Sequence, residues 1–289
     1  MKKFIAILAI LVALCLAAAG CAAPAAEEAA APAGEEPPVE EAAPAEEAAE
    51  QVELIVFAAA SLQETLTQIG ELYQTVAPNV TLIFSFDSSG TLKTQIQEGA
   101  DCDLFISAAQ KQMNQLDAAA DPEVNTEGLD FVEQGTRVDL LENKVALVVP
   151  EGNPANINSF ADIANCESIA LGNDDVPVGQ YSIEILTNLG LLEGLESGSK
   201  ITYGSNVKEV TTQVSEGAVD CGIVYATDAF SAGLTIVDQA QEDMCSQVIY
   251  PAAVLNISQH LGEAKAFLAY LQGEEATAVF ESVGFAPVG

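Results

Sequence analysis

Four positions in the sequence combine small or polar neighbours with the expected start of a helix, which is the chemistry of an anion site. Ser61 and Ser89 stand there in the first half of the chain, and Val178 and Val207 in the second. The first N–H groups of a helix have no intrahelical partner, and the helix dipole favours negative charge beside them. Several such helix starts facing one crevice would bind an oxyanion without Lys or Arg.

Each of these helix starts also has an ordinary structural interpretation. Ser61 and Glu64 have the spacing of a capping box, and the run 88–91 (SSGT) is common at the start of a helix. Tyr225 ends an apolar run, where a tyrosine is more often a core aromatic than a ligand. The residues taken alone therefore predict an anion-binding crevice and do not identify the anion.

Short apolar strands alternate with helical patterns from residue 51 to the end of the chain. Such alternation predicts parallel sheets with helices on both faces, and ligands of these folds lie beyond the carboxyl ends of the strands. Residues 121–143 lack a regular pattern, and we expect them to be irregular. We expect strands at 53–57, 80–86, 103–106, 145–150, 168–171, 201–203 and 222–225, and helices at 61–73, 91–98, 109–118, 179–189, 207–216 and within 262–282.

Two successive strand–helix series predict two lobes of similar construction. We assign residues 51–144 and 247–289 to lobe 1 and residues 145–246 to lobe 2, with strands near 145–149 and 248–254 crossing between them. The fold class is α/β, with a mostly parallel sheet flanked by helices in each lobe and the ligand in the interlobe cleft.

The N-terminus has the pattern of an exported lipoprotein. Lys2 and Lys3 precede an apolar run that is short for a transmembrane helix, and small residues then lead into Cys21. We expect a signal peptide at 1–20 and lipidation of Cys21; an ordinary cleaved signal with an incidental cysteine is the alternative. Residues 21–50 are almost entirely Ala, Glu and Pro, which predicts a disordered tether. The protein is then extracytoplasmic, in the periplasm or on the outer face of the cell membrane.

The formal net charge of −34 limits the classes of partner. Nucleic-acid recognition needs a basic surface, so we exclude it. The same charge gives an anion no long-range attraction, so an anion site must use local, neutral donors. His260 is the only histidine, and no paired nucleophile and base accompany it. We therefore predict that the protein is not an enzyme, that it needs no cofactor, and that it holds no bare metal cation.

Several blocks of sequence occur in an order and at a spacing that identify a family. They are 56–62 (VFAAASL), 86–92 (FDSSGTL) and 100–111 (ADCDLFISAAQK), followed by 143–150, 171–181, 222–228 and 250–251. Over residues 52–289 the chain resembles the molybdate-binding proteins of ABC importers, within the type II solute-binding proteins. The resemblance implies a periplasmic-binding-protein-like fold and capture of molybdate or tungstate. It also implies a cognate ABC permease as partner and a monomer that touches the membrane only through its lipid.

The resemblance further implies which residues bind the anion. Ser61 and Ser89 match hydroxyl and backbone donors of the first lobe, and Tyr225 matches a hydroxyl of the second. Val178 and Val207 match positions that offer a backbone N–H, for which the side chain matters little. Together these five residues form the predicted oxyanion site.

Two departures from the family pattern fall in the same region. Asp87 stands where the family usually has a small residue, and its carboxylate would repel a dianion unless it points to solvent. Gly90 replaces a serine, which removes one donor. The alternatives are a phosphate or sulfate receptor on the same fold, with Asp87 accepting from a protonated phosphate, and a surface interaction lipoprotein.

Four cysteines remain in the expected mature protein, and their wide spacing does not suit a zinc site. In this type of sheet Cys166 and Cys221 stand at the start of neighbouring strands, which makes them candidates for a disulfide. Cys102 and Cys245 would then pair or remain free. Simple buried thiols are the alternative.

Overall fold

The first sheet is built from the two ends of the folded chain. The computed structural model describes residues 50–288, so the predicted signal peptide, Cys21 and the tether up to residue 49 lie outside the described residues. The strand order in this sheet is β11-β4-β10-β3-β1-β2, in which β1 is parallel to β2 and β3, and β10 is antiparallel to β3 and β4. Its strands are β1 (Val52–Ala59), β2 (Val80–Asp87), β3 (Leu104–Ile106), β4 (Val138–Asn143), β10 (Val248–Val254) and β11 (Ala286–Pro287).

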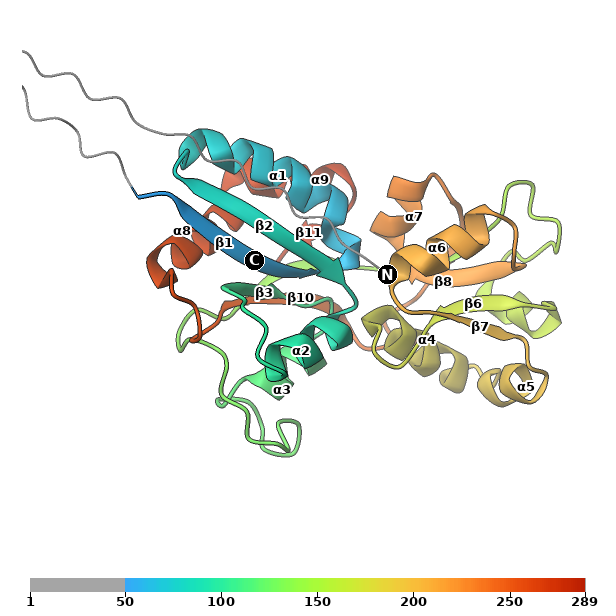
Figure 1. The fold of residues 1–289 in the computed structure, drawn as a ribbon. Helices are drawn as coiled ribbons and strands as arrows, with labels where there is room; N and C mark the ends of the chain where they lie inside the picture. Colours follow the sequence, from blue (N-terminus) through green and yellow to red (C-terminus); the bar gives the residue numbers. More distant parts are fainter. Residues whose placement is uncertain (1–49, 289) are drawn as a thin grey trace, which may run out of the picture. The chain divides into compact units, whose positions relative to one another are not determined.

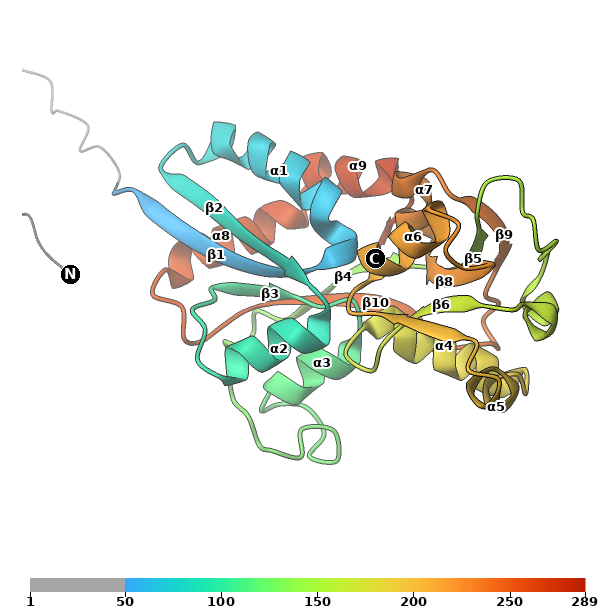
Figure 2. The same ribbon diagram turned by 45° about the vertical axis from the view of Figure 1, so that its right-hand side comes forward.

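Both faces of the first sheet are covered, as the continuous apolar strands predict. Along β1, Leu54 and Val56 join one apolar core with the helices on one face, while Phe57 joins a second core with α2 and α3. Figures 1 and 2 show α2 and α3 on the opposite face of the sheet from α1. The helices are α1 (Gln63–Val76), α2 (Ser89–Gln97), α3 (Gln110–Leu116), α8 (Leu261–Leu271) and α9 (Glu274–Ser282), and a 3-10 turn, η1 (Ala60–Leu62), joins β1 to α1.

The second sheet is built entirely from the middle of the chain. Its strand order is β7-β6-β8-β5-β9, in which β6 is parallel to β7 and β8, and β5 is antiparallel to β8 and β9. The strands are β5 (Val145–Val149), β6 (Ile169–Gly172), β7 (Ile201–Gly204), β8 (Cys221–Tyr225) and β9 (Thr235–Gln239). The helices are α4 (Pro177–Asn188), α5 (Leu192–Ser197), α6 (Val207–Ser215) and α7 (Ala226–Ala232), with a 3-10 segment η2 (Phe160–Asn165) before β6.

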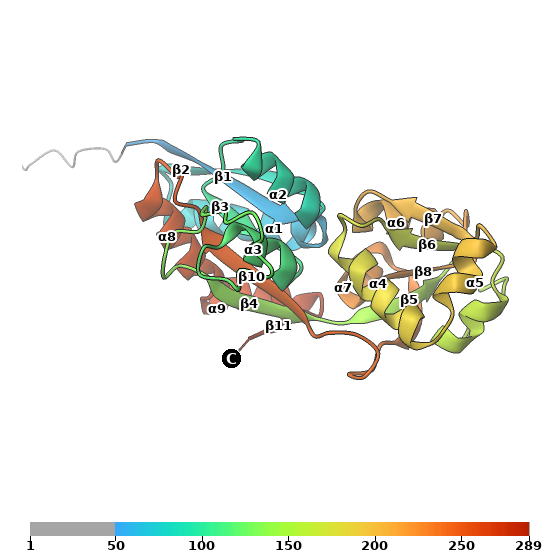
Figure 3. The same cartoon turned by 90° about the horizontal axis from the view of Figure 1, so that it is seen from below.

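These two sheets with their helices confirm the predicted α/β class, and below each is called a lobe. The expectation of mostly parallel sheets is wrong, because both sheets are mixed: β10 runs antiparallel to β3 and β4, and β5 runs antiparallel to β8 and β9. All described residues belong to one compact unit. The chain passes between the lobes twice, at Lys144 and between Gln239 and Val248 (Figure 3). Among residues 50–288, no helix combines the length and apolar character needed to cross a membrane.

Two further expectations about these elements are wrong. Residues 121–143 are not irregular throughout, because β4 occupies Val138–Asn143 and pairs with β10. Its charged residues Asp139 and Glu142 hide the strand pattern in the sequence. The strands β5 and β10 do not cross between the lobes either: in the described part of the chain, β5 pairs within the second sheet and β10 within the first. A fully buried strand needs neighbours along its whole length, which leaves the crossing to the short segments beside it.

Candidate functional site

Ser61 lies in the turn between β1 and α1 and does not cap the helix. The helix α1 begins at Gln63 and has no side-chain cap, so the capping-box interpretation is wrong. The Ser61 side chain is buried, and its Oγ lies 2.9 Å from the hydroxyl of Tyr250 on β10. Its hydroxyl therefore faces the interior beyond the end of β1.

Ser89 is the first residue of α2, and the capping role belongs to its neighbour. The Oγ of Ser88 accepts a hydrogen bond of 3.1 Å from the N–H of Thr91. The Oγ of Ser89 instead accepts one of 2.9 Å from the N–H of Ala108, in the turn after β3. The side chain of Ser89 is fully buried. The turns that follow β2 and β3 are thus held together by this serine.

The two valines of the second lobe stand at helix starts that follow strand ends. Val178 is the second residue of α4, and Val207 is the first residue of α6. Their N–H groups therefore come before the first intrahelical hydrogen bond. A side chain at Gly179 would collide with the carbonyl of Gly172, so the start of α4 lies directly against the end of β6. Both valine side chains are buried, which leaves the backbone as their polar contribution.

Tyr225 ends β8 and reaches across to the first lobe. Its hydroxyl donates to the carbonyl oxygen of Ala108 at 3.4 Å. Its ring centroid lies 5.7 Å from that of Tyr250 and 6.4 Å from that of Tyr181 on α4. Burial raises the pKa of both Tyr225 and Tyr250 well above the ordinary value of tyrosine. Both hydroxyls therefore stay protonated and able to donate.

Three of the predicted ligands, Ser61, Ser89 and Tyr225, are connected through contacts with other residues. Ser61 is joined to Tyr250, whose ring packs against Tyr225, and Ala108 joins Tyr225 to Ser89. Val207 lies close to this group because α6 packs against η1, which carries Ser61 (Figure 2). Val178 is linked less directly, through Tyr181 one turn along α4.

Sequence reasoning missed several polar groups of this region. The side-chain amide of Asn143 lies 2.8 Å from Thr227 Oγ1 and 3.2 Å from the hydroxyl of Tyr250. Asn143 and Tyr250 fall within the resembling blocks, which was the available signal, but neither was assigned a role. Thr227 and Tyr250 are 84 and 107 residues from Asn143 along the chain, so no local pattern shows these contacts.

A partly buried ion-pair cluster lies beside the predicted ligands and was also missed. Lys208 Nζ lies 2.7 Å from Glu64 Oε2 and 3.0 Å from Asp228 Oδ1. Burial raises the pKa of Asp228 to about 6, against the opposing effect of Lys208. Burial lowers the pKa of Lys208, but Asp228 and Glu64 outweigh this effect and raise it. The sequence signal for this cluster was the position of two charged residues. Asp228 ends the resembling block 222–228, and Lys208 directly follows Val207.

The structure places both departures from the family pattern and accounts for the one at position 90. The carboxylate of Asp87 accepts a hydrogen bond of 2.7 Å from the N–H of Ser88, and its side chain is half-buried. The N–H of Gly90 donates to the carbonyl oxygen of Asp175 in the second lobe at 3.0 Å. A Cβ at position 90 would lie 2.5 Å from that oxygen. A serine therefore does not fit at position 90 while this contact is present.

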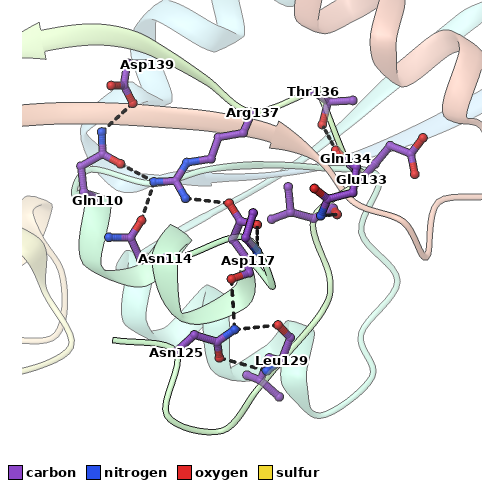
Figure 4. A network of polar contacts seen from close by, with 12 residues as sticks. Gln110, Asn114, Asp117, Asn125, Leu129, Glu133, Gln134, Thr136, Arg137 and Asp139 are labelled. Carbon is purple, nitrogen blue, oxygen red and sulfur yellow. Dashed lines mark hydrogen bonds and ion pairs between the residues drawn. The ribbon is translucent and has the colours of Figure 1, made fainter. Parts of the chain in front are cut away.

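Two surface pockets, of about 410 and 450 Å³, are lined by other residues. In the first, Arg137 Nη1 donates to Asp117 at 2.8 Å, and Nη2 donates to Gln110 and Asn114 (Figure 4). These bonds tie α3 to the segment before β4 and leave the guanidinium well paired. The five predicted ligands are buried instead, so an anion among them would be enclosed by protein.

Among the described residues, four cysteines are present as thiols, and no group of three His, Cys, Asp or Glu side chains could hold a metal ion. A hydrogen bond from Cys221 lowers the pKa of Cys166, and the same bond raises that of Cys221. The two sulfurs are thus neighbours. Their predicted disulfide stays a prediction.

The comparisons with known proteins cover both lobes. A family profile described as bacterial extracellular solute-binding protein matches residues 54–286. A Bacillus subtilis (strain 168) protein, provisionally named ABC transporter substrate-binding lipoprotein YvgL, is 38% identical, over 82% of this chain and 87% of that protein. The molybdate-binding protein ModA of Escherichia coli (strain K12) is 32% identical, over 82% of this chain and 90% of that protein. The structure of the Azotobacter vinelandii periplasmic molybdate-binding protein has a TM-score of 0.70 at 22% identity, over 82% of this chain and 100% of that one, which supports the fold.

Proposed function

The chain belongs to the bacterial extracellular solute-binding protein family, and we propose that it captures molybdate or tungstate for a cognate ABC importer. The observation that carries the proposal is the buried donor set at the facing ends of the two sheets. Identity of 32% to a molybdate-binding relative supports the choice of anion. The matched relatives are named as solute-binding proteins, in agreement with the prediction that this protein is not an enzyme.

The chemistry of the proposed site suits a fully deprotonated oxyanion. Ser61, Ser89 and Tyr225 would offer hydroxyl groups, while Val178 and Val207 would offer backbone N–H groups at helix starts. Molybdate and tungstate carry no proton near neutral pH, so they only accept hydrogen bonds. A protonated phosphate also favours a charged acceptor, and none of the five proposed ligands has a carboxylate. Sulfate would be disfavoured by its shorter bonds, which leave its oxygens further from the donors.

Hydroxyl groups at the site would exchange partners when the anion binds. Ser61 and Tyr250 bond to each other, and Tyr225 makes a long bond of 3.4 Å to Ala108. A charged acceptor forms a stronger hydrogen bond than a neutral one, so these donors would turn towards the anion. Because the donors are buried, we propose that the lobes separate to admit the anion and close around it.

The cellular location is part of the same proposal. Export, lipidation of Cys21 and a tether up to residue 50 would hold the binding domain outside the cytoplasm. The Bacillus subtilis relative is named a lipoprotein, which supports this arrangement. The proposed division into lobe 1 (51–144 and 247–289) and lobe 2 (145–246) places a connection between the lobes at each boundary.

Titration calorimetry of the purified protein with four anions tests the proposal. We expect tight binding of one molybdate or tungstate per chain and little heat with sulfate or phosphate. The variant Ser89→Ala should weaken binding, while Ser215→Ala, which alters an exposed serine on α6, should not. Tighter binding of sulfate or phosphate would favour the corresponding receptor. Absence of binding to all four would favour a surface interaction lipoprotein.

A further inference from the structure

Lys208 joins the two lobes through its ammonium group. It lies on α6 of the second lobe, where Asp228 of α7 is 3.0 Å from Nζ. Its other partner, Glu64, lies on α1 of the first lobe, 2.7 Å away. The Lys208 side chain is 26% exposed, and that of Asp228 is fully buried. This ion pair between lobes is therefore partly shielded from solvent, which strengthens it relative to one on the open surface.

Each member of this cluster is attached to a proposed ligand by a short, rigid connection. Lys208 directly follows Val207, Glu64 is three residues after Ser61, and Asp228 is three residues after Tyr225. The segments that carry Ser61 and Val207 also pack against each other, η1 on α6. A movement that separated Lys208 from Glu64 would consequently move Val207 away from Ser61.

The buried carboxylate of Asp228 is also unusual in its hydrogen bonding. Lys208 lies close enough to form an ion pair, yet neither Asp228 oxygen has a well-formed hydrogen bond among the described residues. A buried carboxylate without hydrogen bonds is costly unless a cation compensates it. Asp228 therefore binds its lysine in either arrangement of the lobes, while Glu64, whose side chain is 49% exposed, can exchange the lysine for water.

We propose that Lys208 is a positioning residue that couples anion capture to closure of the lobes. Asp228 holds its ammonium group in the second lobe, and Glu64 of the first lobe binds that group only when the lobes are together. The ion pair thus stabilises the closed arrangement without contacting the anion. This inference rests on the proposed function, because it assumes an anion held between the lobes.

The variant Glu64→Gln separates this role from a general effect on folding. It removes one charge from a half-exposed side chain and leaves Lys208 paired with Asp228. We expect the dissociation constant for molybdate to rise about fivefold, mainly through faster release of the anion. Release can be followed by tyrosine fluorescence, since the chain contains no tryptophan. Small-angle scattering should show a smaller decrease in radius of gyration on adding molybdate than in the unaltered protein.

A matched control is available within the first lobe. Lys265 and Glu133 form an ion pair of 2.8 Å in which neither partner belongs to the second lobe. The variant Glu133→Gln should leave both the dissociation constant and the scattering response unchanged. The double variant of Glu64→Gln with Lys208→Met should bind no more weakly than Lys208→Met alone, because both changes remove the same contact.

The outcomes separate the two proposals. If the unaltered protein binds none of the oxyanions, the proposed function fails. If it binds molybdate but Glu64→Gln changes neither the affinity nor the scattering response, the proposed function stands and the role of Lys208 is overturned. Equal weakening by Glu64→Gln and Glu133→Gln would likewise overturn it, as a general effect of surface charge.

Discussion

The amide N–H of Gly90 donates a hydrogen bond of 3.0 Å to the carbonyl oxygen of Asp175, and this bond joins the start of α2 to the loop before α4 in the other lobe. A glycine lets two backbones approach this closely, because a Cβ would lie 2.5 Å from the accepting oxygen. Glycine stands at position 90 in place of the serine of the family pattern, and its lack of a side chain permits this contact between the lobes.

The variant Gly90→Ala tests whether this contact supports anion binding. The added methyl group would force Asp175 away and hold the lobes further apart. We expect molybdate affinity to fall by about tenfold, or roughly 1.4 kcal/mol, with little loss of stability, because α2 itself tolerates alanine. Calorimetric titration and thermal unfolding measure the two effects. The control is Gly194→Ala on α5, where a Cβ meets nothing within 4 Å, and unchanged affinity in both variants would contradict the prediction.

Removal of the Tyr225 hydroxyl should affect binding far more than folding. Among residues 50–288 the hydrogen bond of this hydroxyl is a long one to Ala108, so Tyr225→Phe leaves no strongly bonded group there without its partner. A hydrogen bond to a charged acceptor contributes about 2 kcal/mol, which corresponds to about a thirtyfold loss of molybdate affinity. Calorimetry of Tyr225→Phe beside Tyr203→Phe, which alters a half-exposed tyrosine, measures the difference. Equal affinities of the two variants would argue against Tyr225 as a ligand.

The raised pKa of Asp228 predicts a specific dependence of stability on pH. Burial raises its pKa from 3.8 to about 6, so the folded protein holds this proton more tightly than the unfolded chain does. The contribution of Asp228 to stability therefore falls as pH rises from about 4 to 6, by about 3 kcal/mol at most. The groups around it that titrate or carry charge are Lys208, Glu64, Tyr225 and Tyr250.

Urea unfolding at a series of pH values tests this dependence. We expect the stability of Asp228→Asn relative to the unaltered protein to rise between pH 4 and 7, because asparagine carries no charge to bury. Lys208 and the tyrosines titrate well above this range, so they do not account for the change. A stability difference that stays constant over these pH values would show that Asp228 has an ordinary pKa.

The neighbouring thiols of Cys166 and Cys221 are predicted to form a disulfide after export. Ile169 on β6 pairs with Cys221 on β8, and Cys166 lies three residues before Ile169. The lowered pKa of Cys166 favours its thiolate, which is the form that attacks a disulfide. With oxidised glutathione as the oxidant, the Cys166 thiolate would attack its S–S bond and release one reduced glutathione. The Cys221 thiol would then displace the second, so that one S–S bond breaks and one forms. The cross-link would stabilise the fold by about 4 kcal/mol.

Mass spectrometry of the non-reduced protein measures this bond directly. We expect a peptide that links Cys166 to Cys221, with Cys102 and Cys245 open to alkylation after unfolding. Alkylation of all four thiols in protein exposed to the oxidant would contradict the prediction. The variant Cys221→Ser provides the control, since it should leave three alkylatable thiols and lower the melting temperature of the oxidised sample only.

Local patterns were sufficient for most of the strands and for the starts of the helices. The apolar run of β5 and the helix start at Val207 depend on neighbours within a few residues, so the sequence shows them. Local sequence patterns gave the wrong structure at β4 and at Ser61, where tertiary contacts decide the conformation. The charged residues of β4 hide its pairing with β10, and Ser61 lies in a 3-10 turn although its sequence matches a capping box.

The amino-acid sequence is enough to establish the acidic balance, the α/β class and the family, because these features are read from composition, short-range periodicity and ordered motifs. The antiparallel strands that make both sheets mixed are set by tertiary pairing. The contacts of the candidate site required the folded chain. Ser61 meets Tyr250 across 189 residues, and Lys208 meets Glu64 across 144. Such pairs come together only through packing of whole sheets and helices, and the position at which a side chain arrives depends on every layer beneath it.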